Sequence, residues 1–110
     1  MKKNRLGEFQ ELILMTIIVL KNEAYGNSIQ RELEERLSET ISIGAIQTAL
    51  KRMEEKGFVK SIWGEASSVR GGKRKRIYEA TPHAQHVLRE MHSVRSKLWL
   101  EMPESAKGTL

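Results

Sequence analysis

The stretch SIGAIQTALKRMEEKGFV, from Ser42 to Val59, decides the fold. Ser42 is a good N-cap for a helix, because its side-chain oxygen can accept a hydrogen bond from a free backbone N–H of the first turn. Gly57 stands where a glycine commonly ends a helix. The apolar side chains between them line one face: Ile46, Ala49, Leu50 and Met53. The stretch therefore predicts an amphipathic helix that ends at Lys56.

A second amphipathic helix precedes it. From Ser28 to Leu37, apolar side chains recur at positions i, i+4 and i+8, and the short turn SETIS follows. Two helices joined by four or five residues are typical of a helix-turn-helix, whose second helix enters the major groove of DNA. The outward face of that second helix carries small, polar and basic side chains: Ala45, Gln47, Thr48, Lys51 and Arg52.

The hydrophobic period changes to that of strands after Gly57. FVKSIWGE and KRKRIYEA are two short runs with strand character, separated by a stretch that contains glycine and serine. They predict a β-hairpin directly after the helix-turn-helix, in the place of a wing. Gly71 and Gly72 allow the tip of this wing to approach another molecule closely. Five cations surround them: Arg70, Lys73, Arg74, Lys75 and Arg76.

Positive charge is concentrated in this wing. The net charge of the chain is +5, and Lys60 to Ala80 holds six basic residues against two acidic ones. A like-charged run alone is equally well explained as a solvated loop. Next to a helix-turn-helix, however, it can pair with phosphates beside the groove, and each such pair releases condensed counterions. We therefore expect double-stranded DNA as the partner.

The first apolar segment, LILMTIIVL from Leu12 to Leu20, predicts a helix from about Glu8 to Lys21. The acidic start GEFQEL favours a helix over the alternative of a buried strand. A helix that is apolar on all sides must be covered on all sides, and a second subunit is a reasonable source of that cover. The segment is too short for a bilayer span, which takes roughly 20 residues. Glu8 and Glu11 also interrupt any signal-peptide pattern, so we expect a cytoplasmic protein without membrane contact.

The last helix opens at Thr81 and Pro82 and ends before Pro103. Its apolar side chains are spaced as in a coiled-coil seam and predict a homodimer contact: Ala84, Val87, Met91, Val94 and Leu98. The predicted fold is α+β, a winged helix-turn-helix with a C-terminal dimerisation helix. The expected divisions are a DNA-binding domain over 1–82, the dimerisation helix over 83–103 and a frayed tail over 104–110.

Four segments together resemble the PadR family of transcriptional regulators, in its short form with one C-terminal helix. They cover about Leu6 to Pro82 in the order LGEFQELILM, EAYGNSI, SIGAIQTALKRMEEKGFV, and WGE followed by GGKRKRIYEATP. The resemblance implies a cytoplasmic homodimer, usually a repressor that releases DNA when a small molecule binds. It also implies that Tyr25 and Gly26, at the start of the second helix, lie near DNA phosphates.

Further expectations concern single residues on the DNA side. Gln47 and Thr48 are expected to face DNA, as is Lys51, although all three could be ordinary surface residues. Glutamine can pair with adenine through two hydrogen bonds, and lysine can contact guanine or phosphate. Ser42 adds a helix N-terminus that favours anions. The family commonly has an aromatic residue at Gln47, so we expect a different operator preference here. It also often reads Glu-Gly where this chain has His83 followed by alanine.

Trp99 is the candidate effector contact. It follows the last seam position and can either pack there or stack on a planar ligand. The hypothesis is a planar hydrophobic effector held between two copies of the chain. The other expected ligand contacts are Leu12, Met15, Met91 and Val94.

Several functional classes are disfavoured. The chain contains no cysteine and no nucleophile–base pair or phosphate loop of recognisable spacing, so we do not expect an enzyme. His83, His86 and Glu90 have a spacing that can bind a metal, but exposed polar residues give the same pattern, and we expect neither metal nor cofactor. The main alternative is a structural DNA-binding protein with little sequence preference. The charge of the wing argues against a module that binds only proteins.

Overall fold

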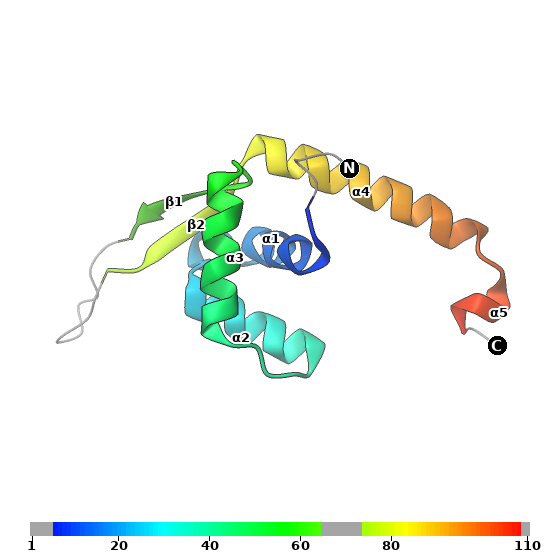
Figure 1. Ribbon diagram of the computed structural model, residues 1–110, viewed down its shortest axis with the longest axis horizontal. Coiled ribbons are helices and arrows are strands. Elements are labelled where there is room, and N and C mark those ends of the chain that lie inside the picture. The colour runs from blue at the N-terminus through cyan, green and yellow to red at the C-terminus, as the bar shows by residue number, and fades with distance from the viewer. Residues whose placement is uncertain (1–5, 65–73, 109–110) are drawn as a thin grey trace.

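The computed structural model describes residues 6–64 and 74–108. It contains helices and one two-stranded antiparallel sheet, as predicted (Figure 1). The elements follow in the order α1 (Glu8–Leu20), the short 3-10 helix η1 (Lys21–Glu23), α2 (Gly26–Leu37), α3 (Ile43–Glu55), β1 (Val59–Trp63), β2 (Arg76–Ala80), α4 (Pro82–Glu101) and α5 (Glu104–Lys107).

The core lies where α1, α2 and α3 meet the base of the hairpin. α1 buries Ile13, Leu14 and Ile17 there, and α2 buries Ile29 and Leu33. α3 buries the face that its apolar spacing predicted, namely Ile46, Ala49, Leu50 and Met53. Phe58 and Val59, which follow α3, are buried in the same core. Because these apolar side chains come from every element around the centre, the three helices and the hairpin form one folding unit.

The turn between α2 and α3 is held by side chains of α2. Gln30 Nε2 donates a hydrogen bond to the carbonyl oxygen of Ile41 over 2.8 Å, and Glu34 Oε2 accepts one from the Ile41 N–H, also over 2.8 Å. Ser42 caps α3 as predicted, since its Oγ accepts a hydrogen bond from the Ala45 N–H over 3.0 Å. With its backbone groups paired, the turn fixes the angle at which α3 follows α2.

The hairpin is anchored at its base. β1 pairs with β2 in a register that places Val59 opposite Ala80 and Trp63 opposite Arg76. The N–H of Tyr78 donates a hydrogen bond to the carbonyl oxygen of Ala24, which lies two residues before the start of α2. The wing is therefore attached to the helix-turn-helix on both sides, through the chain that follows α3 and through this bond.

α4 begins on the core and leaves it. Thr81 Oγ1 accepts a hydrogen bond from the Ala84 N–H over 3.1 Å, and Pro82 is the first helical residue. The first half of the helix packs against the domain, whereas the second half projects beyond it (Figure 1). The protomer is consequently elongated, with extents of 57 × 30 × 21 Å. Among the described residues, no helix is both long enough and apolar enough to cross a bilayer.

Several boundaries differ from the sequence-based expectation, and α3 ends at Glu55 rather than at Lys56. α1 ends at Leu20, one residue earlier than predicted. α2 begins at Gly26 rather than at Ser28, because Ser28 Oγ accepts a hydrogen bond from the Tyr25 N–H over 3.0 Å and so belongs to the first turn. Within the tail that was expected to be frayed, Glu104–Lys107 form the one-turn helix α5, in which Lys107 pairs with Glu104 over 3.7 Å.

Candidate nucleic-acid interface

The outward face of α3 is exposed and polar. Gln47, Thr48, Lys51 and Arg52 are all exposed, while the opposite face of the same helix is buried in the core. Because the buried face anchors α3 in the core, its exposed side chains are held where they can contact another molecule. The structure thus places three predicted reading residues, Gln47, Thr48 and Lys51, on one accessible surface.

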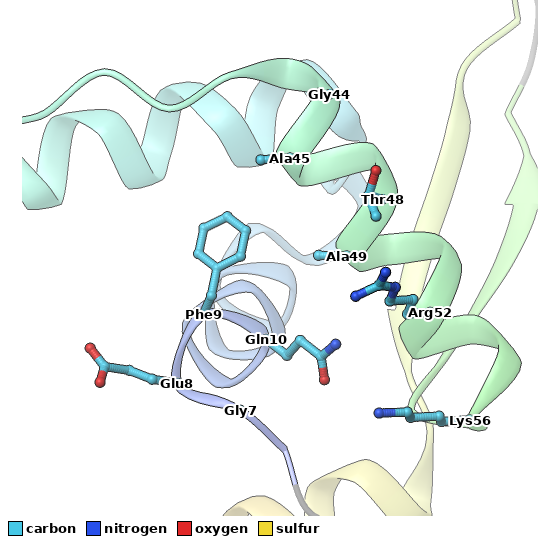
Figure 2. Close-up of a pocket in the computed structure, with 10 residues that line it drawn as sticks. All are labelled: Gly7, Glu8, Phe9, Gln10, Gly44, Ala45, Thr48, Ala49, Arg52 and Lys56. Carbon is cyan, nitrogen blue, oxygen red and sulfur yellow. The ribbon is translucent and has the colours of Figure 1, made fainter.

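The basic surface of α3 extends further than the sequence analysis proposed. An open groove of about 670 Å³ lies between the start of α1 and α3. Figure 2 shows Thr48, Arg52 and Lys56 along its α3 side, facing Phe9 and Gln10 of α1. Arg52 was already expected on the outward face, although without a DNA contact. The spacing of four residues between Thr48, Arg52 and Lys56 is the signal that would have added Lys56, since such residues share a helix face.

Tyr25 and Gly26 stand next to α3 and the wing. Tyr25 precedes the first turn of α2, and Lys75 of the wing places its Nζ 4.0 Å from the centroid of the Tyr25 ring. Lys75, and to a lesser degree Arg31, stabilise the phenolate form, so the pKa of Tyr25 is lowered. Gly26 lies against the side chain of Gln47. Tyr25 therefore contacts the wing, and Gly26 contacts α3.

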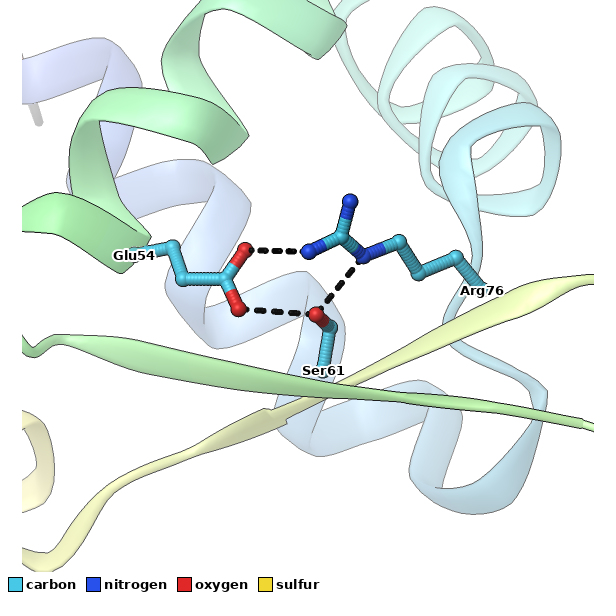
Figure 3. Close-up of polar contacts among 3 residues, drawn as sticks. All are labelled: Glu54, Ser61 and Arg76. Carbon is cyan, nitrogen blue, oxygen red and sulfur yellow. Dashed lines mark hydrogen bonds and ion pairs between the residues drawn. The ribbon is translucent and has the colours of Figure 1, made fainter.

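Arg76 has polar partners inside the protomer. Its Nη2 pairs with Glu54 Oε1 over 3.1 Å, and its Nε donates a hydrogen bond to Ser61 Oγ over 2.7 Å (Figure 3). Ser61 Oγ in turn donates to Glu54 Oε2 over 2.8 Å. This network, which we call the wing brace, joins the last turn of α3 to β1 and β2. The sequence predicted a phosphate contact for Arg76, whereas Glu54 already neutralises its charge.

The other predicted wing cations divide into two groups. Arg74 is exposed, and its Nε donates a hydrogen bond to the backbone oxygen of Gly64 over 3.0 Å. The acceptor of this bond is a carbonyl oxygen and not a carboxylate, so the bond does not neutralise the charge of Arg74. Arg70 and Lys73, together with Gly71 and Gly72, lie outside the described residues, and their predicted phosphate contacts stay predictions.

The predicted dimer seam on α4 divides into two parts. Ala84 is fully buried and Val87 is 9% exposed, because both pack in the core of their own protomer, so neither is free to form the predicted partner contact. Met91 is partly buried against the same core. Val94 and Leu98 are 58% and 60% exposed, which leaves only this second part open to a partner.

The predicted effector contacts divide in the same way. Leu12 and Met91 pack partly against the core of the protomer, and Met15 is exposed on α1. Val94 and Trp99 are exposed on the projecting half of α4. Leu100 is also exposed there, to 76%, and was not predicted.

α4 is held on α1 by an ion pair that the sequence did not reveal. Arg95 Nη1 lies 2.6 Å from Oε1 of Glu11, whose carboxylate is buried. The other carboxylate oxygen, Oε2, is buried with no hydrogen-bond partner among the described residues. Because removing the cation would leave a buried charge unpaired, the pair fixes where α4 leaves the domain.

The part of the chain that the structure describes holds no group of three or more side chains suited to a metal ion. His86 Nε2 instead pairs with Glu90 Oε1 over 2.8 Å, and the ring of His83 stacks on Phe58 with 5.4 Å between ring centroids. These contacts give the candidate metal-binding residues ordinary structural roles.

Comparison with known proteins places this interface in context. Solved structures with the same fold include a PadR-like transcription factor from Bacteroides fragilis, 19% identical with a TM-score of 0.67 over 93% of this chain and 89% of that one. A PadR family regulator from Eggerthella lenta is 24% identical, with a TM-score of 0.58 over 84% and 87%. A PadR family regulator from Clostridium difficile is 29% identical, with a TM-score of 0.58 over 83% and 86%.

No curated protein matches the chain. The family profile described as the transcriptional regulator PadR-like family matches residues 13–90, which include the helix-turn-helix, the wing and the first half of α4. The chain therefore belongs to the PadR-like family of transcriptional regulators, which are DNA-binding winged-helix proteins and not enzymes.

Proposed function

We propose that this regulator is a homodimeric repressor that binds an inverted-repeat operator and releases it when a planar hydrophobic ligand binds. The single observation that carries the proposal is the exposed polar face of α3, with Gln47, Thr48 and Lys51 side by side on the second helix of a helix-turn-helix. These residue types can read base edges in the major groove, which presents a distinct pattern for each base pair.

Cations around α3 supply the phosphate contacts in this proposal. Arg52 and Lys56 lie on the side of α3 that faces α1, and Arg74 lies beside Gly64, just past the end of the strands that is far from the core, so positive charge stands on both sides of the reading residues. Phosphate contacts fix the orientation of a protein on the duplex, while base contacts give the sequence preference. The arrangement suits one duplex that runs past α3 and the wing.

The homodimer is supported by the projecting half of α4. Val94 and Leu98 are more than half exposed there on one face of the helix, which is costly for apolar side chains in water. A second copy that packs against this half-helix would cover them. A two-fold axis through such a contact gives two α3 helices, and half-sites one turn apart would need them about 34–36 Å from each other.

Trp99 supports the ligand response. Its ring is 53% exposed on the same half of α4, where a second copy of the helix would pack. A planar compound stacked between two such rings would alter the crossing of the helices and hence the spacing of the α3 helices. The ligand can shift operator binding only by its differential affinity for the two dimer states.

The experiment is selection of the preferred site from random duplexes with the purified protein. We expect an inverted repeat, bound roughly 10³-fold or more tightly than a scrambled duplex at the same salt concentration. The alternative is a structural DNA-binding protein, which would bind both duplexes equally. Because phosphate contacts occur in both cases, the affinity ratio and not the salt dependence separates them.

A further inference from the structure

Gly26 leaves a space that the side chain of Gln47 fills. Gly26 is the first residue of α2, and Gln47 lies on the exposed face of α3. A Cβ placed on Gly26 would lie 2.7 Å from Gln47 Nε2 and 3.6 Å from Gln47 Cδ. The first separation is shorter than non-bonded atoms tolerate, so the amide of Gln47 occupies the volume that any side chain at position 26 would need.

The backbone of Gly26 gives no other reason for a glycine. Among the described residues, the glycines with positive φ are Gly57 and Gly108, so Gly26 has a conformation that alanine also adopts. The next nearest neighbour, Ile43 Cδ1, would lie 3.7 Å from the added Cβ, which is an ordinary contact. Only the far end of Gln47 would have to move, and a change of its rotamer would relieve the contact and leave the fold intact.

We propose that Gly26 is a specificity-determining position that acts through Gln47. By leaving room beside α2, it sets the orientation in which the Gln47 amide stands before DNA arrives. A glutamine pairs with adenine through both Oε1 and Nε2, so the plane of its amide decides whether the two bonds can form together. Gly26 is thus a positioning residue, and the inference rests on the proposed sequence-specific binding.

The test is a double-mutant cycle with Gly26→Ala, Gln47→Ala and the two combined. Each protein is measured on the selected operator, on operators with single base-pair changes, and on random duplex. We expect Gly26→Ala to reduce discrimination about tenfold at the base pair that Gln47 reads. The discrimination ratio, and not the affinity for random duplex, is the readout, because Gly26 is itself expected near DNA phosphates. In the Gln47→Ala background, the same substitution should have no further effect on discrimination.

Two controls separate this role from a general effect on α2. Asn27→Ala changes the next, exposed residue without adding a Cβ at position 26, and it should preserve the base preference. The midpoint of thermal unfolding for Gly26→Ala should not fall below that of the wild type, because alanine is favoured over glycine at a helical position with ordinary φ. In the absence of DNA, the ¹H–¹⁵N signals of the Gln47 side-chain amide, assigned by their loss in Gln47→Ala, should shift in Gly26→Ala.

The outcomes are distinguishable. If the wild type prefers one site and Gly26→Ala weakens binding equally with and without the Gln47 side chain, Gly26 acts directly on DNA and the inference is overturned. Unmoved amide signals with unchanged discrimination would overturn it as well. If the wild type has no preferred site, the proposed function fails and the specificity role fails with it, whereas a shifted amide signal would still establish the contact.

Discussion

The α3–wing end of the molecule and the second half of α4 hold their exposed side chains in different ways. At the first end, Arg76 is bound by the wing brace and Lys75 lies over the ring of Tyr25. Leu98 and Trp99 are exposed on the second half of α4, and this half of the helix projects beyond the domain (Figure 1). The side chains at the first end are held by contacts within the chain, whereas the apolar side chains on the second half of α4 have no cover among the described residues. In the proposed function, base reading would therefore depend on one chain, and the spacing of the two α3 helices would depend on the pair.

The largest effect is expected at the uncovered end. Leu98→Asp would place a carboxylate in the proposed dimer contact, where an unpaired charge is strongly unfavourable. We expect monomers in sedimentation velocity at concentrations where the wild type is dimeric, and an operator affinity at least about 100-fold lower, because both half-sites are no longer bound together. Ser93→Asp adds the same charge at an exposed position off the predicted seam and should remain dimeric. A dimeric Leu98→Asp protein would place the interface elsewhere.

The next effect concerns the ligand response at the same end. Trp99→Ala should abolish the response of operator affinity to planar hydrophobic compounds, a coupling that is typically about 1–3 kcal/mol. Tryptophan fluorescence can follow the titration, with Trp63 as the fluorophore that remains in the variant. Equal binding of such compounds by both proteins would show that Trp99 only packs against the partner.

A smaller effect is expected from the wing brace. Arg76→Ala removes a partly exposed ion pair, together with its hydrogen bond to Ser61, and should lower the free energy of unfolding by about 1 kcal/mol. Chemical denaturation measures this loss. The slope of log affinity for DNA against log salt should stay as in the wild type if the pair with Glu54 persists on DNA. A slope reduced by about 1 would instead assign Arg76 to the duplex.

Arg74 is the matched comparison for Arg76 and should show the smallest change in stability. Its guanidinium is exposed and contacts a backbone carbonyl rather than a carboxylate. Arg74→Ala should leave unfolding unchanged and reduce the salt slope by about 1, equally for operator and random duplex. If Arg74→Ala and Arg76→Ala behave alike, the two arginines share one role, and the distinction between bound and available wing cations is wrong.

Local chemistry along the chain determined the elements and their order. The cap at Ser42, the glycine at Gly57 and the Thr81–Pro82 pair mark helix ends because they act on backbone groups within one turn of themselves. The apolar spacing of α3 predicted which face is buried, because the helical period places those side chains together. Each of these features appears in the structure as predicted.

Contacts between distant parts of the chain were decided only by the tertiary structure. Arg76 and Glu54 are 22 residues apart, so no local pattern showed that a wing cation is neutralised by α3. The spacing of Ala84 and Val87 identified an apolar face, yet the hydrophobic effect is non-directional, and the face could be covered by its own domain or by a partner. Gly26 and Gln47 likewise belong to different helices, and the space between them exists only once α2 and α3 are packed.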